Sequence, residues 1–329
     1  MNHLKAVVEH KFFIPSRVER FNLKMENNTV LLYSEYDKLH IEILGRKTIA
    51  KLRTLFFDIL SLLFIYLGSS PKICELIENG QSIDIAQFSS KYTPSKRFSN
   101  KEACLCPINN TTINEKVLKL FLNISKMPIN SLQFLLCEAY DKLAQDHRIT
   151  LLLHIIDGLV SKAEVQKAKT YLCGKYPQLY NIKTIGNYLP AVYHLCQNYF
   201  FNYHRKFKCD ILQLLKVTQL KFVQVSADTR NWYSHFLDES KKTNRLQRGE
   251  EMILWFDILH YAIRLMIVSE LKVSIDEEVV KEYYYILHDW ILKILYGKED
   301  NLKSNTYNFV KSFREMFENT IGTVDKNSN

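Results

Sequence analysis

The stretch EMILWFDILHYAIRLMIVSEL at residues 251–271 constrains the fold more than any other part of the chain. It is long enough for a helix of several turns and is apolar on almost every face. A helix on the surface of a globular protein carries a polar face, so a helix of this kind has to be covered by other elements. We therefore expect it to be buried within a helix bundle.

Most of the chain after residue 112 carries a similar helical signal, because apolar residues recur at three- and four-residue spacing. Residues LLLHIIDGLV at 151–160 are apolar on most faces and predict a central helix. Ser274-Ile275-Asp276-Glu277 matches a capping box that opens a helix to about residue 296. The other predicted helical segments are 113–125, 130–145, 148–171, 186–203 and 206–217.

The first 112 residues carry a different pattern. The segments NTVLLYSEY and KLHIEIL alternate with period two and predict strands, and Asn79-Gly80 lies between two alternating segments, which predicts a β-hairpin. Residues 47–68 predict a helix. Its most apolar part, 55–68, contains Asp58 and spans about 14 residues, fewer than the roughly 20 that cross a membrane. We expect it to be a buried helix.

These patterns predict a mostly α protein with two domains. Only 9 Gly and 7 Pro stand against 19 Tyr and 19 Phe, which favours long helices over a turn-rich sandwich. Periodicity is lost from about residue 90 to 113, where we place the boundary. We predict a small α+β accessory domain over 1–112, a C-terminal helix bundle over 113–322, and a disordered polar tail over 323–329.

Charge and cysteine usage indicate a cytoplasmic protein that could bind a polyanion. The formal net charge is +9, which suits RNA, although the positive charges are dispersed. The seven cysteines lack the spacing of a disulfide framework, and charges interrupt the N-terminal segment before a signal peptide can form. Cys104-Leu105-Cys106 lacks the paired spacing of zinc sites. We expect no metal, no cofactor and no membrane partner.

Several familiar chemistries are not indicated. The sequence contains no GxGxxG, GxxxxGK[ST], GxSxG or HExxH motif, which are the sequence signals of dinucleotide binding, P-loop chemistry, α/β-hydrolase catalysis and zinc proteolysis. Three histidines, His154, His260 and His288, lie within apolar helical segments and are expected to be buried or half-buried. The run Tyr283-Tyr284-Tyr285 cannot lie on one face of a helix, so part of it belongs to the core.

The segment SADTRNWYSHFLDE at 226–239 combines groups that can act on a phosphodiester. The imidazole of His235 can exchange a proton near neutral pH, and the guanidinium of Arg230 can hold phosphate oxygens. On a continuous helix the two side chains diverge by about 140°. Either Arg230 reaches round the helix, or the helix starts near it. We expect such a start to be capped by Asp228 or Thr229, so that its free N–H groups also bind the anion. The alternative is that both side chains merely decorate a solvated first turn.

With the helical segments on either side of it, this motif resembles that of the HEPN superfamily, in particular its ApeA-like branch. The match consists of Arg230, the polar Asn231 and His235, preceded by LLLHIIDGL and followed by WFDILHYAIRLMIVSEL. It covers about residues 115–320. ApeA-like proteins commonly carry a larger β-rich N-terminal region than the 112 residues found here.

The resemblance implies a metal-independent endoribonuclease of anti-phage defence, acting by abortive infection, or a toxin. It implies attack by the ribose 2′-hydroxyl on the adjacent phosphate, with His235 as acid or base, Arg230 steadying the charged phosphorane and Asn231 orienting or binding. It also implies a homodimer with a composite active site and an antitoxin or phage trigger. The alternatives are a HEPN-like module that binds RNA or protein without cleaving it, and an unrelated helical interaction protein.

Overall fold

The structure of the protein is a computed structural model. It describes residues 1–10, 20–25, 27–36, 38–86, 104–124, 126–136, 144–177, 187–207, 211–215, 218–235, 245–246 and 249–296. The expected disordered tail at 323–329 lies outside the described residues.

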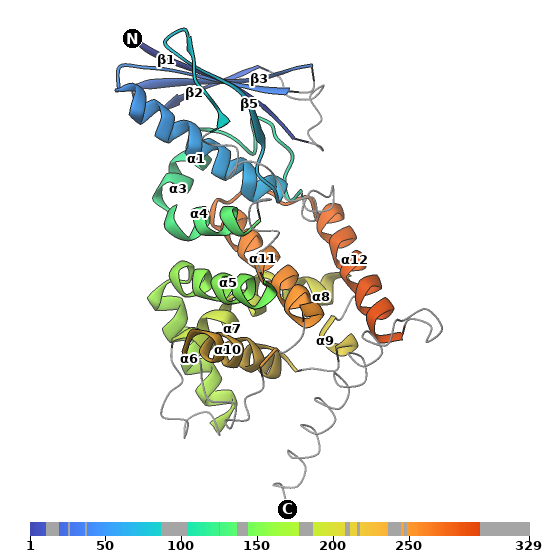
Figure 1. Ribbon diagram of the computed structural model, residues 1–329. Helices are drawn as coiled ribbons and strands as arrows, with labels where there is room; N and C mark the ends of the chain where they lie inside the picture. The colour runs from blue at the N-terminus through green and yellow to red at the C-terminus, as the bar shows by residue number, and fades with distance from the viewer. Residues whose placement is uncertain are drawn as a thin grey trace, which may run out of the picture.

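The N-terminal part forms a six-stranded antiparallel sheet with strand order β2-β3-β4-β1-β5-β6 (Figure 1). Buried and half-exposed residues alternate along β4, so one face of the sheet packs on the core. The two strands predicted from their period are confirmed as β3 and β4. The strand bounds are β1 Asn2–Glu9, β2 Phe21–Met25, β3 Asn28–Glu35, β4 Lys38–Gly45, β5 Lys72–Glu78 and β6 Gln81–Ser82.

The predicted hairpin at Asn79-Gly80 is also confirmed, because these two residues join β5 to β6. Their φ angles are 50° and 83°, both in the left-handed region. A two-residue hairpin turn of type I′ needs positive φ at both positions, and Asn-Gly accommodates it with little strain.

The helix α1 (Ile49–Leu67) contacts strands β1 and β4 on one side and helices α3, α4 and α11 on the other. Its residues from Ile59 to Leu67 are all buried, as expected for the apolar segment 55–68. The helix ends at Gly68, whose φ of 83° is left-handed and whose N–H donates to the Phe64 carbonyl at 2.8 Å. In Figure 1, α1 lies between the sheet and the helical part of the molecule.

The rest of the described chain is helical, so the protein is mostly α with an N-terminal antiparallel sheet. The long apolar helix α11 packs against α1, α5 and α7, as its composition requires. By length and composition Glu251–Glu270 could cross a membrane, but 83% of that window is buried inside the protein, which is the behaviour of a core helix. The helix bounds are α3 Glu115–Asn123, α4 Lys126–Leu135, α5 Gln145–Leu159, α6 Lys162–Lys175, α7 Tyr188–Tyr199, α8 Phe201–Phe207, α9 Ile211–Leu214, α10 Gln219–His235, α11 Gly249–Glu270 and α12 Glu277–Tyr296.

Four predicted helical segments differ from the structure. The segment 148–171 is two helices, because Ser161 and Glu164 form a capping box that starts α6. The segments 186–203 and 206–217 are cut into α7, α8 and α9, with Phe200 at the end of α7. The helix after residue 274 exists as α12, but its cap is Asp276, whose Oδ1 accepts from Glu278 N at 3.2 Å and Val279 N at 3.4 Å.

The buried guanidinium of Arg264 joins the sheet-bearing part to the bundle. From α11 it donates to the carbonyls of Ile65 at 2.9 Å and Tyr66 at 3.1 Å. These carbonyls lie in the last turn of α1, where helix geometry leaves them without an intrahelical partner. The Tyr66 carbonyl also accepts from Leu105 N at 2.6 Å, and the Leu105 carbonyl accepts from Asp276 N at 3.0 Å. The predicted domain boundary near residue 112 stays a prediction.

Candidate functional site

The predicted motif lies in the second half of helix α10, so the expected helix start at Arg230 is wrong. The helix begins at Gln219. Thr229 does not cap it. Its buried hydroxyl donates to the Val225 carbonyl at 2.7 Å and accepts from Leu246 N at 2.9 Å. Backbone N–H groups inside a helix already donate within the helix, so those around Arg230 cannot bind an anion. Any anion at this site has to be bound by side chains alone.

Arg230 occupies the junction of three helices. Its Nη2 lies 3.5 Å from Oδ2 of Asp157 on α5, and its Cζ lies 5.3 Å from the ring centroid of Tyr188 on α7. The Arg230 side chain is 22% exposed and that of Asp157 is 38% exposed, so the ion pair lies at the molecular surface. Asp157 contacts the guanidinium through one oxygen at this distance. A well-placed oxyanion would instead bind the planar guanidinium through two oxygens.

The ring of Tyr188 packs against the guanidinium of Arg230. Its ring is buried, and its hydroxyl has no hydrogen-bond partner among the described residues. Burial raises the pKa of Tyr188 well above its usual value, and Arg230 partly opposes that shift. The phenol therefore stays neutral, and the cation–π contact holds the arginine head in place.

The two other predicted site residues are on the same helix. Asn231 is exposed, and its Oδ1 accepts from Nη1 of Arg230 at 3.3 Å. His235 is the last residue of α10, and its side chain lies outside the described atoms. The backbone therefore places all three residues within the last turns of one helix, and whether Arg230 and His235 act together stays a prediction.

A second polar contact crosses from α5 to α10 beside the first. Nε2 of His154 lies 3.2 Å from Oγ of Ser234, and Nδ1 of His154 lies 2.8 Å from the Thr150 carbonyl. His154 was expected to be buried or half-buried, and this is wrong because it is exposed. Ser234 follows Arg230 by four residues, and Asp157 follows His154 by three. The His154–Ser234 contact therefore lies one helical turn from the Arg230–Asp157 ion pair.

Residues 245–246 contact another side of α10. The Arg245 guanidinium lies 3.2 Å from the ring centroid of Trp232, and the Tyr233 hydroxyl lies 3.4 Å from the Leu246 carbonyl. With the Thr229–Leu246 hydrogen bond, these contacts tie the helix down on that side.

Among the described residues, no three His, Cys, Asp or Glu side chains converge as a metal site would require. Cys106 is buried, and burial raises the pKa of its thiol to about 12, which disfavours the thiolate that binds metals. Of the other predicted core residues, His260 and Tyr284 are buried, whereas Tyr285 is 47% exposed. The tyrosine run is thus divided between core and surface, as expected.

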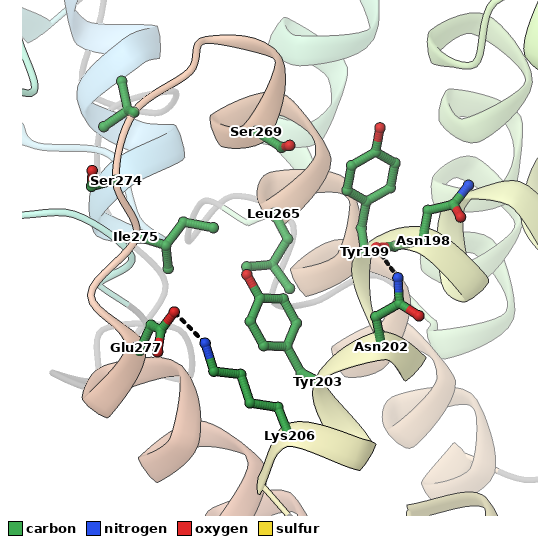
Figure 2. A pocket seen from close by; sticks show the side chains of 11 residues that line it. Asn198, Tyr199, Asn202, Tyr203, Lys206, Leu265, Ser269, Ser274, Ile275 and Glu277 are labelled. Atoms are coloured by element: carbon green, nitrogen blue, oxygen red, sulfur yellow. Dashed lines mark hydrogen bonds and ion pairs between the residues drawn. The ribbon is translucent and has the colours of Figure 1, made fainter.

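A separate pocket of about 540 Å³ lies between α7, α8, α11 and the start of α12 (Figure 2). Tyr203, Leu265 and Ile275 point into its centre. Lys206, the basic residue among the described lining residues, is paired with Glu277 at one side. Because no residue of the α10 motif lines this pocket, it is separate from the site predicted for phosphodiester chemistry.

Comparison of the chain with protein-family models, with curated proteins and with solved structures finds no match. The resemblance to HEPN proteins therefore rests on Arg230, Asn231, His235 and the helices around them.

Sequence reasoning missed four residues of this site: His154, Asp157, Tyr188 and Ser234. A signal for two of them was present in LLLHIIDGLV, where Leu151, His154 and Asp157 recur at three-residue spacing and are all exposed. That spacing marks the one face of α5 that the core does not cover. Their partners on α10 and α7 could not be read from any spacing, because they depend on how the helices pack.

Proposed function

We propose that the protein is a metal-independent endoribonuclease of the HEPN type, acting in anti-phage defence or as a toxin. Its substrate is RNA, and Arg230 and His235 are its catalytic residues, with Asn231 in support. Two copies of the chain forming a homodimer, and an antitoxin or phage trigger, belong to the same proposal.

The observation that carries the proposal is the state of Arg230. Its guanidinium is braced by the Tyr188 ring, lies at the surface, and already holds one oxygen of an oxyanion, the Asp157 carboxylate, at 3.5 Å. A phosphate can replace that carboxylate and make two contacts where Asp157 makes one. This arrangement of Arg230 therefore supports the binding of a phosphate group of an RNA backbone.

The chemistry needs no group that this chain lacks. The ribose 2′-hydroxyl is the nucleophile, so the protein has to supply proton transfer and stabilisation of the charged phosphorane. Arg230 supplies the positive charge and His235 an imidazole. The products are a 2′,3′-cyclic phosphate and a 5′-hydroxyl. DNA lacks the attacking hydroxyl and is not cleaved.

A second candidate is a HEPN-like module that binds RNA or protein without cleaving it. The same ion pair favours it, because Asp157 neutralises Arg230 and the two residues could serve only to join α5 to α10. A binder of this kind retains intact RNA, and its affinity falls steeply as salt is raised.

The first prediction tests these two candidates. His235→Ala should lower RNA cleavage by about 10²–10⁴-fold and Arg230→Ala by about 10²–10³-fold, because they remove a proton-transfer group and an electrostatic clamp. Asn231→Ala should cause a smaller loss. Cleavage of total RNA is measured with purified protein in EDTA, and the product ends are analysed for the cyclic phosphate.

Matched controls are available on neighbouring helices. His147→Ala removes an exposed imidazole from α5, and Lys162→Ala removes an exposed cation from α6; both should cleave as the wild type does. Circular dichroism melts verify that every variant is folded. Wild-type cleavage by His235→Ala would end the assignment at this site, and intact RNA retained by the wild type would favour the binding module.

A further inference from the structure

We infer that His154 is a second catalytic histidine of this site, and that it is the general base which takes the proton from the ribose 2′-hydroxyl. This inference rests on the proposed function. It begins from a contact that the motif does not include, the hydrogen bond between His154 Nε2 on α5 and Ser234 Oγ on α10 at 3.2 Å.

The hydrogen bonds of His154 determine which nitrogen can accept a proton. Nδ1 lies 2.8 Å from the Thr150 carbonyl oxygen, and a carbonyl only accepts, so Nδ1 carries the hydrogen and donates it. In the neutral ring Nε2 then holds the lone pair, and the Ser234 hydroxyl donates to it. The backbone of α5 therefore presents Nε2 as a proton acceptor, and a ribose hydroxyl can take the place of the serine hydroxyl.

The position of His154 fits this role. It lies one turn from Asp157, the partner of Arg230, and Ser234 immediately precedes His235 in α10. On its other side His154 lines a groove of about 340 Å³ between α4 and α5, with Met127, Phe134 and Leu151 among the residues of its walls. The imidazole is exposed, and its Nε2 faces Ser234 on α10, the helix that also carries Arg230, so a ribose hydroxyl can reach Nε2 from solvent.

The proposed step is balanced within the chain and its substrate. The 2′-oxygen forms a bond to phosphorus while its proton passes to Nε2 of His154. The bond from phosphorus to the 5′-oxygen breaks, and that oxygen receives a proton from the imidazolium of His235. Arg230 holds the phosphorane oxygens. The two histidines end in each other's starting protonation states and exchange protons with water before the next turnover.

The test compares His154→Gln with His147→Gln, a matched change of an exposed histidine on the same helix. His154→Gln should slow cleavage of RNA by about 10²–10⁴-fold, as loss of a general base does. His147→Gln should keep the wild-type rate. His154 is exposed and not part of the core, so the melt of His154→Gln should match that of the wild type.

A second substrate separates the base from the acid. In a ribonucleoside 3′-(4-nitrophenyl phosphate) the leaving group departs without a proton, so the acid is dispensable and the base is not. His235→Ala should regain activity on this substrate, whereas His154→Gln should stay slow on both.

Each outcome decides one claim. If the wild type cleaves RNA and His235→Ala does not, while His154→Gln remains fully active, the role of His154 is overturned and the proposed function stands. Recovery of His154→Gln on the nitrophenyl substrate would also overturn its role as the base. A wild type that cleaves neither substrate would overturn the proposed function, and the role of His154 with it.

Discussion

At the scale of single residues, Asp157 and an RNA phosphate compete for the same guanidinium. Exposed ion pairs contribute about 0.2–1 kcal/mol, so Asp157→Asn should cost little stability and should lower the KM for RNA by about two- to fivefold. Steady-state cleavage kinetics measure this. The control is Asp146→Asn on the same helix, whose carboxylate is about equally exposed and contacts His147. Marked destabilisation by Asp157→Asn with an unchanged KM would instead mean that the ion pair is structural.

His10 provides a residue-scale prediction on pH. Burial, and secondarily the charge of Arg264, lowers the pKa of His10 from 6.5 to about 4, and its Nε2 lies 2.8 Å from Ser69 Oγ. The folded protein keeps this histidine neutral, whereas the unfolded chain binds a proton below its pKa of 6.5. The stability that His10 contributes is therefore fully present above pH 6.5 and is lost as the pH falls towards 4, in total about 3 kcal/mol.

Urea unfolding between pH 7 and pH 4 tests this. The free energy of unfolding should fall less steeply with decreasing pH in His10→Gln than in the wild type, whereas the exposed His147→Gln should follow the wild type. Equal slopes in His10→Gln and the wild type would show that His10 is protonated equally in both states.

At the scale of elements, Arg264 connects α11 to α1, two helices that are far apart in the chain. Its guanidinium donates hydrogen bonds to two carbonyls in the last turn of α1. Arg264→Met should therefore destabilise the protein by about 1–3 kcal/mol, because the buried Ile65 carbonyl loses its donor, whereas the Tyr66 carbonyl keeps the hydrogen bond from Leu105 N. The control is Arg46→Met, an exposed arginine whose loss should change stability by under about 0.5 kcal/mol. Chemical denaturation measures both, and a loss under 1 kcal/mol for Arg264→Met would mean that other groups satisfy these carbonyls.

At the scale of the whole molecule, the proposed role of His154 means that a dimer does not have to supply the second proton-transfer group. The resemblance implies a composite site in a homodimer, where two copies of a motif with one histidine each would supply the two proton-transfer groups that cleavage calls for. His154 and His235 lie on adjacent helices of one chain, so we expect each protomer to hold a complete pair, even in the homodimer that we propose.

Mixing variants tests this. His154→Gln and His235→Ala protomers are unfolded together and refolded, and light scattering reports the oligomeric state. We expect the mixture to stay inactive. Recovery of about a quarter of the wild-type activity would instead show that each site combines His154 of one copy with His235 of the other, since half of the dimers would then contain one intact site.

Local rules made much of the fold predictable. The strands β3 and β4, the turn at Asn79-Gly80, the end of α1 at Gly68 and the burial of α11 each follow from a few neighbouring residues. The errors were also local. The apolar spacing of 148–171 predicted one helix, but the capping box at Ser161 starts a second. Asp228 and Thr229 resembled helix caps, but both lie inside α10.

The sequence by itself determined the strands β3 and β4, the turn at Asn79-Gly80, the burial of α11 and which residue types stand in the motif of α10. Only the tertiary structure decided that Arg230 meets Asp157 and Tyr188, that His154 turns its Nε2 towards Ser234, and that Arg264 reaches α1. The physical reason is that hydrophobic periodicity is a property of one helix, whereas the residue that lies opposite a side chain depends on the angle and offset at which two helices pack.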